Sequence, residues 1–297
     1  MTQIVRAQHM GFCFGVRDAL KAADAADAPD QTAIFGELVH NADVVSRLQN
    51  QQFQLISETS RESIPERETV MITAHGISET RRQDLIDAGK QLIDTTCPLV
   101  RRVHEAAIGL SKRGYFVVVV GKQDHVEVLG VVEDLPQGSW AVVSSPDQAA
   151  RFASENIGVI CQTTMPEELG VACRDQIAEL NPQATVRWIN TICRPTRQRQ
   201  SAVDELCRQV EVVVVVGGMN SNNTKRLAER CIALGKTAYH VQSADDVQKE
   251  WVSHVARIGL TAGTSTPDDI IDSVEARIRE LVAEAPTAKR DASEKQS

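Results

Sequence analysis

The sequence of 297 residues lacks the short motifs that would assign it to a functional class at once. It has no Cys-x-x-Cys pair, which argues against a zinc ribbon or a thioredoxin-type redox site. Its Asn-rich glycine turn at 217–224 has neither the Gly-Lys-Ser/Thr of a phosphate loop nor a Gly-x-Gly-x-x-Gly fingerprint. Its longest apolar runs, at 115–120 and 212–216, are far too short to cross a bilayer, and no charged-then-apolar leader precedes residue 13. We therefore expect a soluble globular protein.

An excess of positive charge is also missing. With 32 Lys and Arg against 40 Asp and Glu, the formal net charge is −8. Nucleic acids and anionic membrane surfaces attract proteins through a basic face, so neither is expected as a main partner. An anionic small molecule would have to be held by local hydrogen-bond donors.

The seven cysteines show no paired spacing, and a chain of this size does not need disulfides to fold. We therefore expect reduced thiols and a cytoplasmic location. A hydrophobic content of 42% is enough for two or three domains with substantial cores. The stretch 284–297 is polar and charged without an aromatic residue, and it predicts a disordered tail.

Short β-branched runs alternate with helix-like segments along the chain. The expected strands are 4–7, 33–36, 70–73, 91–94, 115–120, 141–144, 158–161, 186–188, 211–216, 237–240 and 257–261. The expected helices are 16–26, 100–112, 166–180, 196–209, 224–234 and 267–283. This alternation is typical of the α/β class, with mostly parallel sheets joined by crossover helices. Polar turns follow the strands directly, and ligands bind at the carboxyl ends of strands in such folds.

Three isolated cysteines, Cys13, Cys97 and Cys193, each follow an expected strand in a turn rich in Gly, Thr or Pro. They are separated by 84 and 96 residues, and 104 residues follow the third, so each segment is about the size of one α/β unit. Three similar units would then each deliver one thiolate to a shared centre. Three thiolates suit an iron–sulfur cluster with one iron left open, although thiolates also bind zinc. The corresponding domains are 14–97, 98–193, and 194–283 together with 1–13.

The remaining cysteines do not share this setting. Cys is among the most buried residue types and usually behaves as a small hydrophobe. Cys161 lies in an apolar run, and Cys173, Cys207 and Cys231 lie in helix-like segments. We expect these four to be core residues.

Two turns resemble anion cradles. Residues 217–224 follow an apolar strand and open a helix with Ser221, Asn222 and Asn223, and residues 261–267 repeat the arrangement with Ser265. Backbone N–H groups and short polar side chains at a helix start suit a phosphate, although a plain Asn-rich cap explains the first turn equally well. Two such turns favour a diphosphate over a single carboxylate.

Three histidines, His40, His75 and His125, occupy similar turns, where imidazole N–H groups donate to phosphate oxygens. Glu127 is a candidate general acid, and Thr163 or Thr164 a candidate proton relay. Zinc held by His125, Glu127 and a cysteine is the rival metal site. A cysteine nucleophile with His and Asn is a further alternative.

Nine motifs taken together resemble one family. They are Gly11-Phe12-Cys13-Phe14-Gly15-Val16, Val39-His40-Asn41, Ala74-His75-Gly76, Asp94-Thr95-Thr96-Cys97-Pro98, His125-Val126-Glu127, Gln162-Thr163-Thr164, Thr191-Ile192-Cys193 with Arg199-Gln200, Asn220-Ser221-Asn222-Asn223, and Thr264-Ser265-Thr266-Pro267. Spanning about residues 4–283, they are similar to the 4-hydroxy-3-methylbut-2-enyl diphosphate reductases, the last enzymes of the methylerythritol phosphate route to isoprenoids.

The resemblance implies three related α/β domains arranged pseudo-threefold around a central 4Fe-4S cluster. Cys13, Cys97 and Cys193 would be its three protein ligands, with one iron open and subject to loss as a 3Fe-4S form on isolation. The diphosphate would be held by His40, His75, His125, Ser221, Asn222, Asn223 and Ser265, and Thr163 and Glu127 would lie at the hydroxymethyl end. Asn222 stands where the family often has Ser, and Val126 where it often has Pro.

The implied reaction is a two-electron reductive dehydroxylation that yields isopentenyl and dimethylallyl diphosphate, with a proton delivered through Glu127 and Thr163. A ferredoxin or flavodoxin would supply the electrons to a monomer or homodimer. A zinc-dependent phosphohydrolase and a non-catalytic iron–sulfur sensor that binds a diphosphate are the alternatives.

Overall fold

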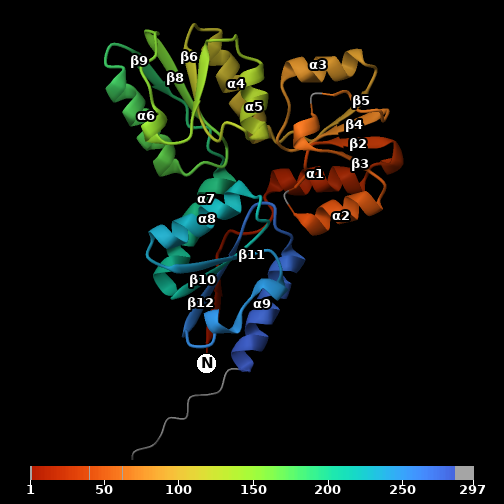
Figure 1. Cartoon of the computed structure of the whole chain (residues 1–297), viewed down its shortest axis with the longest axis vertical. Helices are drawn as coiled ribbons and strands as arrows, with labels where there is room; N and C mark the ends of the chain where they lie inside the picture. Colours follow the sequence, from red (N-terminus) through yellow and green to blue (C-terminus); the bar gives the residue numbers. More distant parts are fainter. Residues whose placement is uncertain (1, 40, 62, 285–297) are drawn as a thin grey trace, which may run out of the picture.

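The computed structural model describes residues 2–39, 41–61 and 63–284. The chain forms three lobes, each with one four-stranded sheet, and the lobes meet at a shared centre that α1 and α7 approach (Figure 1). All strand pairs are parallel, which confirms the predicted α/β class.

Each lobe repeats the same order of elements. The first lobe contains α1 (Phe14–Asp24), β2 (Thr32–Phe35), α2 (Ala42–Asn50), β3 (Gln54–Ile56), β4 (Thr69–Ile72), α3 (Glu79–Asp87) and β5 (Gln91–Asp94). The second contains α4 (Pro98–Ser111), β6 (Phe116–Val120), α5 (Val126–Glu133), β7 (Trp140–Val143), β8 (Asn156–Cys161), α6 (Glu167–Leu180) and β9 (Thr185–Trp188). The third contains α7 (Arg194–Gln209), β10 (Val212–Val216), α8 (Asn222–Ala233), β11 (Thr237–Val241), β12 (Arg257–Ala262) and α9 (Asp268–Ala283), with β1 (Gln3–Arg6) from the start of the chain. Short 3₁₀ turns lie at Pro29–Gln31, Glu58–Ser60, Pro146–Gln148, Ala244–Asp246 and Lys249–Trp251.

The three sheets have the same strand order: β3-β2-β4-β5, β7-β6-β8-β9 and β11-β10-β12-β1. Strand β1 therefore stands in the third sheet where β5 and β9 stand in the others. The chain begins in the third lobe, crosses into the first at α1, and returns to the third at α7. Every crossing between lobes follows one of these edge strands.

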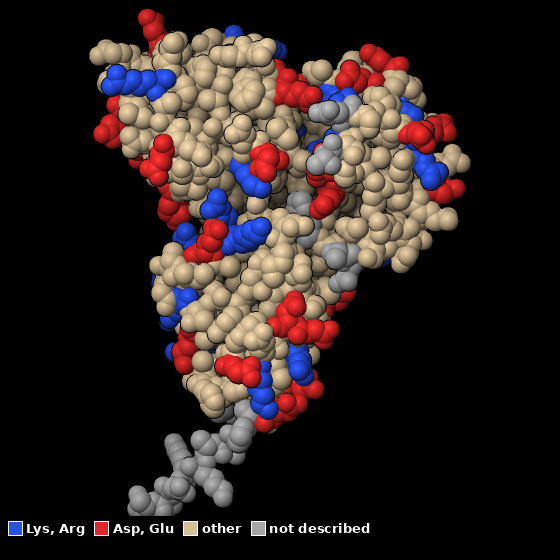
Figure 2. All heavy atoms as spheres, viewed as in Figure 1, with Lys and Arg blue, Asp and Glu red and all other residues tan. Residues whose placement is uncertain are grey.

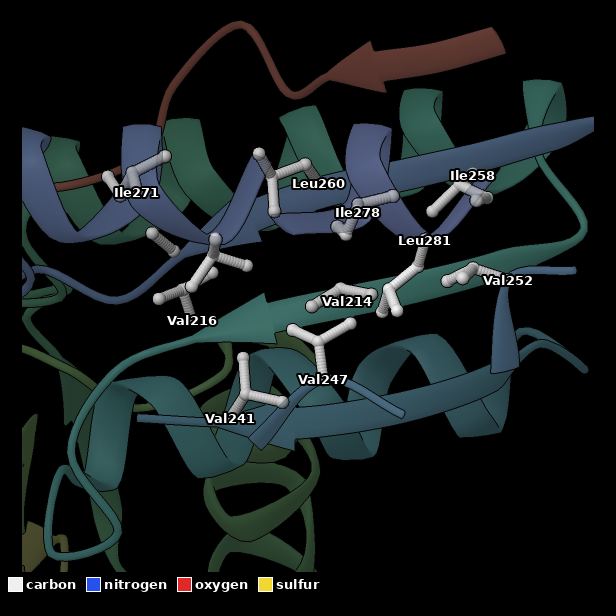
Figure 3. Packing of buried hydrophobic residues seen from close by; sticks show 12 residues of the cluster. Val214, Val216, Val241, Val247, Val252, Ile258, Leu260, Ile271, Ile278 and Leu281 are labelled. Atoms are coloured by element: carbon white, nitrogen blue, oxygen red, sulfur yellow. The ribbon is translucent and has the colours of Figure 1, made fainter. Parts of the chain in front are cut away.

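The sequence explains the central strands. Strand β10 consists of five valines, all buried, and β6 has four valines that are 0–1% exposed. A strand covered by helices on both faces has no polar side, so it is a continuous run of β-branched residues. In the third lobe, Val214 of β10 and Leu260 of β12 pack against Ile278 of α9, as Figure 3 shows.

Four elements were not expected from the sequence: β3, α2, α3 and α5. Strand β3 has three residues, and α3 buries only Leu85, so neither has a detectable apolar period. Helix α5 reads Val-Glu-Val-Leu-Gly-Val-Val-Glu, which is β-branched and nearly all buried. Helix α2 is nine residues long and opens beside His40, where we had expected only a polar turn.

Among the described residues, no helix is both long and apolar enough to cross a membrane. The predicted tail falls outside the described part of the chain from residue 285 onward, and Glu284 caps α9.

Candidate active site between the three lobes

The polar turns singled out in the sequence follow equivalent strands in the three lobes. One set follows β2, β6 and β10, a second follows β4, β8 and β12, and the three cysteines follow β5, β9 and β1. All of these turns lie at the carboxyl ends of parallel strands, the edge where open α/β sheets bind ligands. Because the lobes meet at these edges, the turns border one cavity.

Cys13, Cys97 and Cys193 all line this cavity. Each is the residue before a helix, namely α1, α4 or α7. Each also donates its backbone N–H to the turn after the third strand of its own sheet, at 3.3 Å to Thr264 O, 3.1 Å to Ala74 O and 3.0 Å to Thr163 O respectively. The same backbone contact therefore fixes all three thiols at the junction of the lobes.

The donor set fits a group larger than a single metal ion. In the described residues, no three Cys, His, Asp or Glu side chains lie close enough together to hold one ion, whereas three cysteines border the same cavity. Burial raises the pKa of Cys97, and raises that of Cys193 to about 11. These thiols are therefore not activated nucleophiles, which argues against the cysteine-nucleophile alternative. Soft sulfur donors of this kind are the usual ligands of an iron–sulfur cluster.

A glycine makes room for one of these thiols. A Cβ on Gly15, in the first turn of α1, would lie 2.8 Å from Cys97 Sγ and 3.1 Å from Cys97 Cβ. The two residues lie at opposite ends of the segment 14–97 in sequence but come together at the centre. Any larger side chain at Gly15 would displace Cys97.

Glu127 is buried beneath the cavity, with 1% of its surface exposed. Thr163 N–H donates to Oε1 at 2.6 Å, and Thr163 Oγ1 donates to Oε2 at 2.7 Å. Desolvation raises the pKa of Glu127 to about 7, although the two Thr163 hydrogen bonds act in the opposite direction. A carboxyl with this pKa holds a proton for part of the time at neutral pH, and the adjoining hydroxyl can both accept and donate one.

His75 and His125 both border the cavity, and their rings lie edge to face with centroids 5.6 Å apart. His125 caps α5, and its Nδ1 accepts the Glu127 N–H at 3.1 Å. A neutral His125 therefore carries its ring proton on Nε2, as a hydrogen-bond donor. The predicted partner His40 lies outside the described residues, and Asn41 beside it caps α2 by accepting from Val44 N–H at 3.0 Å.

The predicted anion cradle brings Ser221, Asn222, Asn223 and Ser265 to the same cavity. Ser221 caps α8, and its Oγ lies 3.4 Å from Ser265 Oγ, so the two turns adjoin. Asn223 is 5% exposed, and its buried Nδ2 has no hydrogen-bond partner within the described part of the chain. A buried amide donor is costly to leave unpaired, so this site suits an anionic ligand. Helix α8 begins here, and the start of a helix favours an anion, which adds to that preference.

The zinc alternative is not supported by the side-chain contacts. Both Glu127 oxygens accept hydrogen bonds from Thr163, and His125 Nδ1 accepts from the backbone. These contacts hold the two side chains as hydrogen-bonding groups.

Sequence reasoning missed part of the cavity lining. Val16, Val100 and Thr196 all contribute to it, and each stands three residues after one of the cavity cysteines. Aligning the three cysteine-capped helices would have found them. Thr196 Oγ1 also lies 3.1 Å from Cys193 Sγ.

The cysteines expected in the core are there: Cys161, Cys173, Cys207 and Cys231 are at most 3% exposed. Two further histidines have structural contacts. His240 Nε2 lies 2.9 Å from Gly217 O, and His104 Nδ1 lies 3.8 Å from Asp134.

Several relatives match nearly the full length of the chain. The 4-hydroxy-3-methylbut-2-enyl diphosphate reductase of Aquifex aeolicus is 38% identical over 286 residues, covering 95% of this chain and 97% of the relative. The enzyme of the same name from Geobacter sulfurreducens is 39% identical over 282 residues, covering 94% and 98%.

Solved structures agree. A structure of (E)-4-hydroxy-3-methyl-but-2-enyl diphosphate reductase, the terminal enzyme of the non-mevalonate pathway, is 38% identical, covers 94% of this chain and 100% of its own, and has a TM-score of 0.67. The E-1-hydroxy-2-methyl-but-2-enyl-4-diphosphate reductase from Plasmodium falciparum, at 24% identity and a TM-score of 0.84 over 96% and 89% of the two chains, supports the fold. The LytB protein family matches residues 4–279, and with relatives this similar over nearly its whole length, the chain belongs to that family.

Proposed function

We propose that this protein converts 4-hydroxy-3-methylbut-2-enyl diphosphate to isopentenyl and dimethylallyl diphosphate, in isoprenoid biosynthesis by the methylerythritol phosphate pathway. The relatives that match nearly its full length are named as reductases of this diphosphate. The observation that carries the proposal is the meeting of three cysteine thiols and one buried carboxyl at a single cavity. A phosphohydrolase needs no such set of sulfur donors.

The cofactor in this proposal is a 4Fe-4S cluster bound by Cys13, Cys97 and Cys193. With three protein ligands, one iron stays open, and its loss on isolation would give a 3Fe-4S form. When bound, the cluster supplies the electrons and a Lewis acid for the allylic oxygen. The position of the three thiols on one cavity, with Gly15 leaving room for Cys97, supports this ligand set.

The diphosphate is proposed to bind at the cradle of Ser221, Asn222, Asn223 and Ser265. The unpaired Asn223 Nδ2 and the start of α8 support this placement. His75 and His125 border the same cavity, and His40 remains a prediction outside the described residues. Asn222 keeps a hydrogen-bonding side chain where the family often has Ser.

The reaction consumes two electrons and two protons: the C–O bond of the alcohol breaks, the oxygen leaves as water, and a C–H bond forms on the allyl unit. In this proposal Glu127 supplies the proton that the leaving hydroxyl needs, and Thr163 Oγ1 passes it on. The short Glu127–Thr163 contacts and the pKa of about 7 support these roles. The apolar lining at Val16 and Val100 keeps competing water away.

The proposed electron donor is a ferredoxin or flavodoxin, small acidic one-electron carriers. Three exposed arginines, Arg17, Arg101 and Arg197, each stand four residues after a cavity cysteine, one helical turn away. Equivalent positions in three similarly ordered lobes support a shared basic ring around the centre. On the face in Figure 2, acidic and basic side chains are interspersed.

The domain boundaries 14–97, 98–193 and 194–283 with 1–13 are part of the proposal, and the identical strand order of the three sheets supports them. A monomer or homodimer and a cytoplasmic location are proposed with them.

The test is an anaerobic assay of the iron-loaded protein with 4-hydroxy-3-methylbut-2-enyl diphosphate and dithionite-reduced methyl viologen. We expect oxidation of the viologen and five-carbon diphosphates that lack the hydroxyl oxygen. Release of inorganic phosphate without consumption of reductant would instead favour the phosphohydrolase.

A further inference from the structure

Arg199 connects the turns that hold two of the cavity cysteines. It lies on α7, six residues after Cys193, and is 6% exposed. Its Nη1 donates to Pro195 O at 3.0 Å, and its Nη2 donates to Gly11 O at 2.6 Å. Gly11 precedes Cys13 by two residues, and Pro195 follows Cys193 by two. One guanidinium therefore ties the turn of Cys13 to the turn of Cys193.

The charge of this guanidinium has no carboxylate to balance it in the described part of the chain. Other poorly exposed arginines there have one, since Arg82 lies 2.8 Å from Asp94 and Arg230 lies 2.5 Å from Asp204. Arg199 forms no such pair, and its buried Nε has no hydrogen-bond partner among the described residues. A buried cation without a counter-ion is strongly destabilising, so an anion is expected close by.

The turns that Arg199 contacts hold two of the cavity cysteines, Cys13 and Cys193. Cysteines that bind a metal cluster do so as thiolates. A cluster held by these thiolates is the natural counter-charge, and each electron that it takes up adds one more negative charge nearby. A fixed positive charge then stabilises the reduced form more than the oxidised form.

We propose that Arg199 is a positioning residue for the iron–sulfur centre, which holds the turns of Cys13 and Cys193 together and raises the reduction potential of the centre. This inference rests on the cluster of the proposed function. Its neighbour Gln200 has a related contact, donating from Nε2 to Met165 O at 3.3 Å in the turn that follows Thr163 and Thr164. The start of α7 thus braces two of the turns that border the cavity.

The test compares Arg199→Gln and Arg199→Lys with the parent, under argon, in an equilibrium redox titration with dithionite. Electron paramagnetic resonance follows the reduced cluster. At the midpoint reduction potential of the parent, we expect the Gln variant to contain about ten times more oxidised than reduced cluster. This ratio corresponds to a midpoint potential lower by about 59 mV for one electron. Arg199→Lys should restore most of the parent value because it keeps the charge.

Arg208→Gln is the matched control, because it removes the same charge from the same helix at its exposed end. It should leave the potential unchanged. A second readout is the rate at which a chelator removes iron: the Lys variant, which cannot donate to both carbonyl groups as the guanidinium fork does, should lose iron several-fold faster than the parent.

The two outcomes that overturn the inference are distinct from failure of the proposed function. If the cluster of the Gln variant has the same reduction potential as that of the parent, Arg199 has no electrostatic role. If the Gln variant does not fold, a Lys variant that loses iron no faster than the parent removes the positioning role. A parent protein that binds no cluster at all would refute the proposed function itself.

Discussion

Glu127 changes charge near neutral pH because burial raises its pKa to about 7. A proton donor must be protonated to act, so we expect turnover to fall above pH 7 as the carboxyl ionises. Glu127→Gln should lower kcat by roughly 10²- to 10⁴-fold and abolish this decline, while leaving iron content and the resonance spectrum intact. The check is a pH–rate profile of both proteins with chemical reductant. A Gln variant with turnover close to the parent would remove Glu127 from the mechanism.

The same burial makes a prediction for stability. Since the folded-state pKa of Glu127 lies above its ordinary value of 4.5, the folded protein favours the neutral form. The stability from this preference is fully present below pH 4.5 and is lost as the pH rises through 7. The free energy of unfolding that Glu127→Gln gains over the parent, both without cluster, should therefore be larger at pH 8 than at pH 5, by up to about 3 kcal/mol.

Unfolding by urea at the two pH values measures the difference. Glu275→Gln is the matched control, for which we expect the opposite change in the free energy of unfolding. This buried carboxylate has a lowered pKa beside Arg6 and Arg279. The substitution should destabilise the protein at both pH values. A Glu127→Gln variant equally stabilised at pH 5 and pH 8 would contradict the assigned pKa.

At the scale of elements, the site depends on helices that begin at cysteines. The first turn of α1 fits against Cys97 only because Gly15 has no side chain. Gly15→Ala should therefore displace the Cys97 thiol and greatly reduce the iron retained after anaerobic gel filtration. Gly109→Ala in α4, where the nearest atom to a new Cβ is a flexible Arg113 nitrogen at 3.4 Å, should retain iron and gain up to about 1 kcal/mol of stability. Equal iron retention in the two variants would show that the close approach has no role.

The elements also show what could be predicted from the sequence. Strands such as β10 could be predicted because five consecutive valines strongly favour a buried strand. The polar turns that follow such strands could be predicted as site positions. Helix α5 was not, since its valines favour a strand, and the contacts that bury them come from other parts of the chain. Gly15 and Arg199 were quoted within motifs without a role, because their function depends on contacts with Cys97 and Gly11, far away in the chain.

At the scale of the whole molecule, three exposed arginines stand at equivalent positions, each one helical turn after a cavity cysteine. Replacing Arg17, Arg101 and Arg197 together with Gln should slow reduction by ferredoxin about tenfold or more at low ionic strength and flatten its salt dependence. Activity with dithionite-reduced viologen should not change. A control triple variant at the exposed residues Arg113, Arg208 and Arg257 should behave like the parent. Equal slowing in both triple variants would indicate a general charge effect and no docking surface.

The threefold repeat of the molecule makes the three cysteines equivalent, although they come from distant parts of the sequence. Anaerobic purification with iron and sulfide analysis and electron paramagnetic resonance tests this equivalence directly. We predict a cluster in the parent and in Cys173→Ala, a buried core cysteine, and loss or severe depletion of it in each of Cys13→Ser, Cys97→Ser and Cys193→Ser. Iron and sulfide contents that are the same in all five proteins would contradict the shared centre.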